Sequence, residues 1–322
     1  MRVALAVLAA ALLASGAAGQ LPAGTTLPAT TYPADVDALH ALRASLTNLP
    51  RDWSATEDPC GTPACGPMLS TRCAWTGLAC NASRVVAVWL PCLRDWCFSV
   101  GGTLAPGLAG ASELELVEFQ GNQIGGTLPP EWGALERLVV LSAGYNLLTG
   151  TLPPSYSNLS ALEHVRLSGN QLRGGLPPDW GSLGQLRELL VGDNELDGGF
   201  PANWAGMASM QVLVFESNRL SGPLPAAWVR MYQLQVLDVR DMCGVCGAVP
   251  FNQVVRLGMS GSSLGWPCGS GNCSGLPLGF LGQAVIISAI LLVLVTLCLW
   301  RRIWLFRRHG SDGQRSGLGL VR

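Results

Sequence analysis

The 322-residue sequence contains no lysine, so all 20 of its basic residues are arginine. This absence excludes the phosphate-binding lysine of a Walker loop, the strand lysine of a protein kinase and a Schiff-base amine. Histidine is also scarce, because only three are present and none stands at a metal-ligand spacing. We therefore expect no metal and no cofactor.

The few charges are unevenly distributed. Residues 20–275 hold 13 arginines against 20 acidic residues, whereas residues 301–322 hold six arginines against one acidic residue. A mildly acidic body with a short basic tail is typical of a membrane protein rather than of a nucleic-acid-binding protein.

Two apolar segments predict the topology. Residues 1–19 have the early charge, apolar run and small residues of a secretory signal peptide. Residues 278–300 carry no charge, and a helix rising about 1.5 Å per residue crosses a hydrocarbon core of about 30 Å over that length. The arginines that begin at Arg301 favour a short basic cytoplasmic tail over residues 301–322. We expect a single-pass plasma-membrane protein with its N-terminus outside.

Cysteine usage agrees with export. Ten of the eleven cysteines precede the second apolar segment, which predicts five disulfides. They are Cys60, Cys65, Cys73, Cys80, Cys92, Cys97, Cys243, Cys246, Cys268 and Cys273. Proximity in the sequence favours the pairs Cys92–Cys97, Cys243–Cys246 and Cys268–Cys273, while the first four allow three pairings. N-glycosylation sequons begin at Asn81, Asn158 and Asn272.

A 24-residue repeat occupies the middle of the chain. Its marker asparagines are Asn122, Asn146, Asn170, Asn194 and Asn218. Around each, apolar residues recur in the leucine-rich repeat pattern LxxLxLxxNxL. One coil of such a repeat cannot bury its apolar face alone, so stacked coils supply the core. The expected fold class is an α/β repeat solenoid with a parallel sheet on its concave side, in which each asparagine turns inward to satisfy backbone groups.

The second half of each repeat narrows the subclass. Gly126-Thr-Leu-Pro129, Gly174-Gly-Leu-Pro177 and their equivalents resemble the LxGxIP element of plant-type leucine-rich repeats. An aromatic residue follows each proline by three positions, and its strict register favours packing on the convex side over a ligand platform. The five aromatic residues are Trp132, Tyr156, Trp180, Trp204 and Trp228.

The N-terminal segment extends the resemblance to plant leucine-rich repeat receptors. Residues 37–46 predict an amphipathic helix, and Cys73-Ala-Trp75-Thr-Gly77-Leu-Ala-Cys80 is similar to the CxWxGVxC motif of their N-terminal cap. That resemblance implies a Cys73–Cys80 disulfide. Twelve additional residues before the motif depart from the family and favour an extra Cys60–Cys65 bridge.

These observations predict six regions. We expect the signal peptide at 1–19, a cysteine-containing cap at 35–84 and about seven repeats at 85–250, of which five are regular at 114–233. A C-terminal cap and juxtamembrane segment follow at 251–275, before the transmembrane helix and the tail.

The concave surface is the expected ligand-binding face, because parallel strands hold the side chains between their buried leucines in rows. Val139, Val140 and Leu190, with Tyr145 close by, predict an exposed apolar strip, and His164 between charged neighbours suggests pH-sensitive binding. The full set of predicted contacts is Glu118, Val139, Val140, Tyr145, Glu163, His164, Arg166, Arg187, Glu188, Leu190 and Glu216.

No enzymatic activity is expected. The only nucleophile-elbow pattern, Gly261-Ser-Ser-Leu-Gly265, lacks the required strand–turn–helix context. The resemblance implies a receptor-like protein or co-receptor without a kinase, which binds an extracellular peptide, glycan or protein and signals through a membrane partner. The alternative is an adhesion module or an inhibitor of extracellular cell-wall hydrolases, like the related polygalacturonase inhibitors.

Overall fold

The structure is a computed structural model, and it describes residues 31–53, 58–60, 75–81, 83–91, 99–251, 254, 256–265 and 268. The predicted signal peptide, transmembrane segment and basic tail lie outside these residues. So do Asn272 and five of the ten cysteines that were predicted to form disulfides, which are Cys65, Cys73, Cys92, Cys97 and Cys273. Within the described ranges, no helix combines the length and the apolar character that crossing a bilayer requires.

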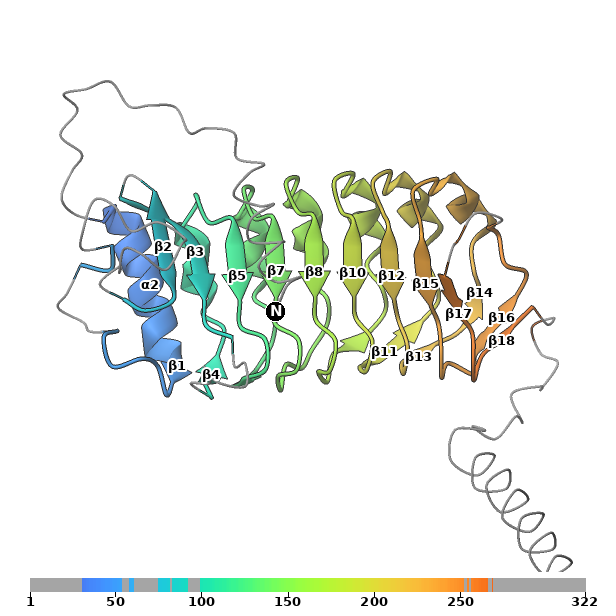
Figure 1. Cartoon of the computed structure of the whole chain (residues 1–322), viewed down its shortest axis with the longest axis horizontal. Coiled ribbons are helices and arrows are strands. Elements are labelled where there is room, and N and C mark those ends of the chain that lie inside the picture. Colours follow the sequence, from blue (N-terminus) through green and yellow to red (C-terminus); the bar gives the residue numbers. More distant parts are fainter. Residues whose placement is uncertain are drawn as a thin grey trace, which may run out of the picture. The chain divides into compact units, whose positions relative to one another are not determined.

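A nine-stranded sheet lines one face of a solenoid (Figure 1). Each strand from β3 onward is parallel to the next, while β2 pairs antiparallel with β3 as a hairpin at the N-terminal end. In chain order the strands are β2 (Leu78–Asn81), β3 (Arg84–Trp89), β5 (Leu116–Glu118), β7 (Val140–Ser142), β8 (His164–Arg166), β10 (Glu188–Leu190), β12 (Val212–Val214), β15 (Val236–Asp238) and β17 (Arg256–Gly258).

The register of this sheet confirms the repeat read from the sequence. Leu141, Val165 and Leu189 are in-register neighbours, each 24 residues from the next, and all three are buried. Because side chains alternate across a strand, the middle residue of each strand points into the coil and the two flanking residues point to the concave face. The apolar middle residues form the core.

The five repeat asparagines form a buried ladder along the solenoid. In the Asn170 coil, the side-chain Nδ2 donates to the carbonyl groups of Ala143 and Leu167, and Oδ1 accepts from the Leu148 N–H at 3.0 Å. The other four make equivalent bonds. These amides therefore satisfy backbone groups that the tight bend of each coil removes from water.

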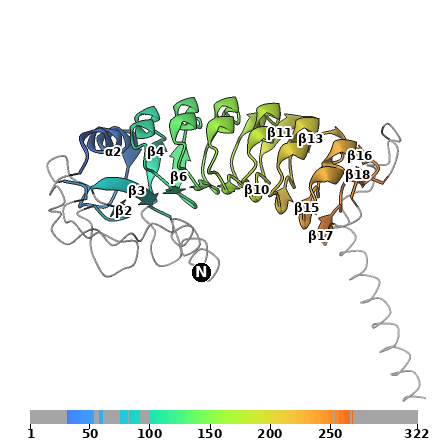
Figure 2. The ribbon, with the colours of Figure 1, turned by 90° about the horizontal axis from the view of Figure 1, so that it is seen from above.

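Short 3-10 helices occupy the opposite, convex side (Figure 2). They are η1 (Pro106–Gly110), η2 (Pro130–Ala134), η3 (Pro154–Asn158), η4 (Pro178–Ser182), η5 (Ala202–Gly206) and η6 (Ala226–Arg230). Five of them carry the aromatic stripe, and all five aromatic side chains are fully buried. The predicted packing role is thus confirmed.

The aromatic stripe also accounts for the curvature of the solenoid. The ring centroids of Tyr156, Trp180, Trp204 and Trp228 follow one another at 6.3, 6.5 and 6.1 Å, whereas adjacent strands are about 4.8 Å apart. Each indole donates to a carbonyl of the preceding coil, as from Trp204 Nε1 to the Pro177 oxygen at 2.9 Å. Wider spacing on the aromatic side bends the stack toward its strands, as Figure 2 shows.

Shorter strands form a second edge on the side of each coil. They are β4 (Gly101–Thr103), β6 (Gln123–Gly125), β9 (Arg173–Gly174), β11 (Glu195–Gly198), β13 (Arg219–Leu220), β14 (Gly222–Pro223), β16 (Val245–Gly247) and β18 (Ser263–Leu264). They include the glycines of the LxGxIP-like element, which hold positive φ angles such as 75° at Gly174.

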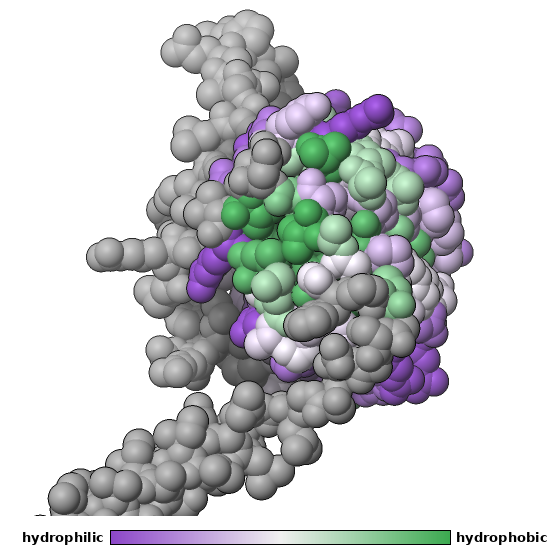
Figure 3. All heavy atoms as spheres, turned by 90° about the vertical axis from the view of Figure 1, so that its right-hand side faces the viewer, coloured by the Kyte–Doolittle hydropathy of each residue, from purple (hydrophilic) through white to green (hydrophobic). Residues whose placement is uncertain are grey.

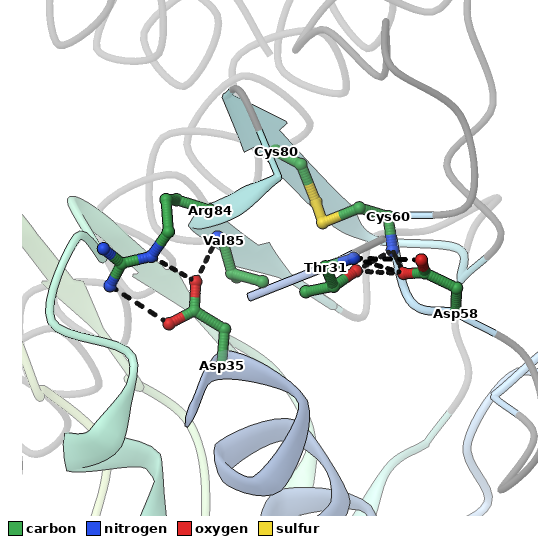
Figure 4. Close-up of a disulfide and its surroundings, with 7 residues drawn as sticks. All are labelled: Thr31, Asp35, Asp58, Cys60, Cys80, Arg84 and Val85. Carbon is green, nitrogen blue, oxygen red and sulfur yellow. Dashed lines mark hydrogen bonds and ion pairs between the residues drawn. A yellow bond between two sulfur atoms is a disulfide. The ribbon is translucent and has the colours of Figure 1, made fainter. Parts of the chain in front are cut away.

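The N-terminal cap covers the first coil with helix α2 (Pro33–Ser45) and the short strand β1 (Leu46–Thr47). The buried Asp35 carboxylate accepts bonds from the Val85 N–H at 2.8 Å and from the Arg84 guanidinium at 3.0 and 3.2 Å (Figure 4). Burial of this carboxylate is offset because it is both paired and hydrogen-bonded. The contact fastens the helix to the edge of the sheet.

A disulfide in the cap differs from the expected pairing. Cys60 bonds to Cys80 (Figure 4), so Cys80 does not pair with Cys73 and Cys60 does not pair with Cys65. The Cys60 N–H donates to the Thr31 hydroxyl at 2.9 Å, and the Tyr32 N–H donates to the Ser83 carbonyl between β2 and β3 at 2.8 Å, so the Cys60 segment lies beside the β2 hairpin. The cap is closed by a bridge that spans 20 residues.

The C-terminal coil contains a second correction. Cys246 bonds to Cys268, in place of the expected pairs Cys243–Cys246 and Cys268–Cys273. The partners are 22 residues apart, about one turn of the solenoid, so coiling brings them side by side although the sequence separates them. Cys243 is exposed.

Candidate functional site

Two columns of side chains line the concave face. The first column runs along the first residues of the registered strand triplets, in the order Ala87, Leu116, Val140, His164, Glu188, Val212, Val236 and Arg256. The second column runs along the third residues, in the order Trp89, Glu118, Ser142, Arg166, Leu190, Val214, Asp238 and Gly258.

A charged cluster occupies the middle of the face. The Arg166 guanidinium bonds to the Glu188 carboxylate, and Arg187 Nε lies 3.4 Å from the Glu163 carboxylate. His164 stands between the two acids, with Nδ1 3.7 Å from Glu188 and Nε2 3.9 Å from Glu163. The five predicted residues are therefore brought together, with opposite charges interleaved across β8 and β10.

Electrostatics within this cluster favour the ionised form of Glu188. Its burial opposes ionisation, but the interactions with His164 and Arg166 outweigh the burial and lower the pKa of Glu188 to about 2. Glu118 behaves in the opposite way, because burial raises its pKa against the bonds from the Gln120 N–H and the Ser142 hydroxyl, both at 2.9 Å. One face thus holds two carboxylates with contrasting proton affinity.

An acidic group lies at the C-terminal end of the face. Arg240 bonds to the carboxylates of both Glu216 and Asp238. Burial raises the pKa of Glu216, and the negative charges of Asp238, Asp193 and Asp241 raise it further. The Arg240 guanidinium is therefore shared between two carboxylates.

The exposed apolar strip differs in position from the prediction. Val140 is only 1% exposed, although it belongs to the first column, where it lies in register between Leu116 and His164. Tyr145 is 58% exposed but lies in the turn after β7, outside both columns. The half-buried apolar side chains of the columns gather nearer the C-terminus, where they form an apolar strip of Leu190, Val212, Val214 and Val236.

Two features of this surface escaped the sequence analysis. Trp89 is 45% exposed and stands next to Glu118 in the second column, although the alternation of Val85, Val88 and Leu90 around it already indicated an outward side chain. Tyr145 has a φ of 54°, a strained conformation for a bulky residue. The equivalent residues Asp193, Ser217 and Asp241 of other coils also have positive φ angles, so this conformation belongs to the turn of the repeat.

The concave face presents charged side chains beside apolar ones. Among the described residues, no group of three or more histidine, cysteine or acidic side chains is arranged to hold a metal ion. Ser263, the serine of the nucleophile-elbow pattern, lies buried in the short strand β18. The arrangement offers ion pairing and apolar contact along a rigid, curved surface.

Comparison with known proteins agrees with this architecture. The family model for the Leucine Rich Repeat matches residues 161–183. No sequence among the curated proteins matches the chain. Solved structures provide the remaining comparison, and they bear on the fold of the chain.

Three solved structures are similar to the chain. The Arabidopsis receptor kinase HAESA, solved with the peptide hormone IDA and the co-receptor SERK1, is 24% identical over 72% of this chain and 42% of that one, with a TM-score of 0.58. PEPR1–AtPEP1 is 23% identical over 76% and 37%, with a TM-score of 0.54. Pollen Receptor Kinase 3 is 22% identical over 67% and 98%, with a TM-score of 0.54.

The chain thus spans less than half of the first two structures and nearly all of the third. Identities at this level establish the fold, and that fold is the one observed in plant receptor ectodomains. The chain therefore has the leucine-rich repeat fold.

Proposed function

We propose that this chain is a cell-surface receptor-like protein or co-receptor. In this proposal its concave face binds an extracellular peptide, glycan or protein, and a membrane partner supplies the signalling activity. Residues 278–300 anchor it in the plasma membrane with the solenoid outside. Asn81 and Asn158, which are both exposed, carry N-linked glycans.

The observation that carries the proposal is the contact between two unlike surfaces on the concave face. Glu188 and Leu190 belong to the same strand, so the charged cluster and the apolar strip meet at β10. From there the apolar side chains continue onto β12 and β15. Interfaces combine an apolar centre with polar groups at the rim, and this face has both.

A peptide or protein ligand suits this surface better than a catalytic substrate. The side chains are distributed along several coils rather than gathered in one pocket, so an extended ligand contacts them in sequence. The interleaved acids and arginines select the ligand's charge pattern, because a like charge opposite a fixed partner is disfavoured. HAESA was solved in complex with a peptide hormone, which supports the same ligand class for this chain.

A matched pair of substitutions tests the use of this face. Val214→Arg places a charge in the apolar strip, whereas Val229→Arg makes the same change at an exposed position of η6 on the convex side. Full-length protein is screened against synthetic extracellular peptides and cell-wall oligosaccharides. We expect any ligand found to lose about tenfold or more in affinity with Val214→Arg and to bind the Val229→Arg control normally.

Two outcomes would contradict the proposal. Equal binding by wild type and Val214→Arg would place the ligand elsewhere on the chain. Stoichiometric inhibition of a cell-wall hydrolase, without any signalling partner recovered from membranes, would establish the inhibitor function instead.

A further inference from the structure

Among the described strands, the last strand of the nine-stranded sheet has a neighbour on one side only. β17 is the terminal strand of the nine-stranded sheet and pairs only with β15 among the described strands. The Arg256 N–H donates to the Gln235 oxygen at 2.9 Å, and the Gly258 oxygen accepts from the Val239 N–H at 2.9 Å. Since backbone groups of successive residues alternate in direction, the N–H and C=O of Leu257 point outward. An open edge of this kind is a template for another strand.

Apolar side chains surround this edge. Figure 3 shows them gathered at the C-terminal end of the solenoid. Val249, Val254 and Leu257 are half-buried against the core, and Met259, directly after β17, is 41% exposed. Partly accessible apolar side chains that gather at one end mark an interaction site more often than chance.

The carboxylates next to this edge have few positive partners. Gly258 leaves room for the Asp238 carboxylate, which occupies the place where a side chain at 258 would stand. Asp238 belongs to the acidic group that has Arg240 as its positive partner. One further positive charge reaching Asp238 from outside would improve the balance.

The sequence of β17 is self-complementary about Leu257. Arg256 on one side carries an exposed positive side chain on the concave face, and Gly258 on the other side exposes the Asp238 carboxylate. In an antiparallel pair of two β17 strands centred on Leu257, residue 256 of each copy stands opposite residue 258 of the other. Two arginines thus avoid each other, and each meets the other copy's acidic group.

We propose that two copies of this chain pair edge to edge through β17, with a two-fold axis at Leu257 and Arg256 of each copy beside Asp238 of the other. The two outward backbone groups of Leu257 bond across the axis, and Met259 of both copies packs beside it. The sheet then continues from one solenoid into the next. This pairing is an isologous contact, in which the same patch serves both partners. It goes beyond the proposed ligand binding and does not depend on it.

Oligomeric state of the full-length chain in detergent micelles tests the pairing. We expect wild type to form a dimer whose dissociation constant rises by about tenfold or more with Arg256→Glu, because two attractive contacts become repulsive. The control is Arg219→Glu, the same charge reversal at a highly exposed side chain away from this edge. Sedimentation over a range of protein concentrations measures each constant.

Mixing two variants separates loss of contact from loss of folding. Arg256→Glu and Asp238→Arg are each expected to be monomeric alone, since each places like charges opposite one another. Mixed together, they restore an opposite charge at both contacts and form a heterodimer. A wild-type monomer at all concentrations, a dimer unaffected by Arg256→Glu, or a mixture that remains monomeric would each overturn the proposal.

Discussion

The repeat asparagines are expected to contribute unequally to the stability of the solenoid. Each internal carbonyl group of the ladder accepts from two amides, as Ala143 does from Asn146 and Asn170. At the C-terminal end this redundancy stops, because the next coil has the buried Met242 where an asparagine would stand. Among the hydrogen bonds of the described residues, the Phe215 carbonyl therefore accepts from Asn218 alone.

The magnitude follows from counting the groups left without a partner. Asn170→Ala orphans one buried backbone group, the Leu148 N–H, because its two carbonyl partners keep another amide each. Asn218→Ala orphans two, the Leu196 N–H and the Phe215 carbonyl. At about 2 kcal/mol for each unsatisfied buried group, the expected losses in unfolding free energy are about 2 and about 4 kcal/mol.

Urea denaturation of the full-length chain in micelles measures both losses. Fluorescence of the buried tryptophans on the convex side reports unfolding of the coils. Asn203→Ala, at an exposed side chain of η5, is the control and is expected to cost less than about 0.5 kcal/mol. An internal substitution as costly as Asn218→Ala would refute the argument from shared carbonyls.

Further predictions concern single side chains. Trp204→Ala loses a buried stack and an indole hydrogen bond and is expected to cost about 3–5 kcal/mol, whereas Trp89→Ala leaves thermal stability unchanged and weakens concave-face binding. Tyr145→Gly, at a positive φ, raises the unfolding free energy by about 1 kcal/mol in the same urea assay, and a loss would show that its packing outweighs its strain. Because the pKa of Glu188 is lowered, its ionised form contributes to the unfolding free energy above about pH 4.3, and this contribution is lost as the pH falls toward 2. Glu188→Gln is expected to remove on the order of 2 kcal/mol of this dependence of stability on pH, measured by thermal melting at each pH.

The repeat was predictable from the sequence because its signal is periodic. A spacing of 24 residues between asparagines determines which residues stand side by side, so the core and the aromatic stripe followed at once. Backbone satisfaction and apolar stacking recur identically in each coil, which leaves few alternatives. Position in the repeat was thus sufficient to distinguish buried Trp180 from a ligand platform.

The disulfides were not predictable by the same reasoning. Pairing by proximity in the sequence favoured cysteines three to five residues apart, and the family resemblance implied one pair seven residues apart. The observed partners are separated by 20 and 22 residues. A coil returns the chain next to itself after about that distance, so spatial and sequence neighbours differ. Leu190 of the predicted apolar strip is half-buried on the concave face, whereas Val140 is only 1% exposed, and the strand pattern alone did not distinguish these two positions.

The aromatic stripe and the asparagine ladder determine how the length of the solenoid can change. Each indole of the stripe reaches a carbonyl 27 residues earlier in the sequence, and four of the five repeat asparagines reach one of their partners at the same separation. The exception is Asn122, whose partner Leu90 is 32 residues earlier. Extra residues between such partners, like those between Leu90 and Asn122, leave the bond in place and add no strand between β3 and β5, whereas adding or removing 24 residues adds or removes one strand and gives each donor an equivalent acceptor. The molecule can therefore lengthen or shorten its concave face only in whole coils, and each added coil brings two new outward positions for a ligand to meet.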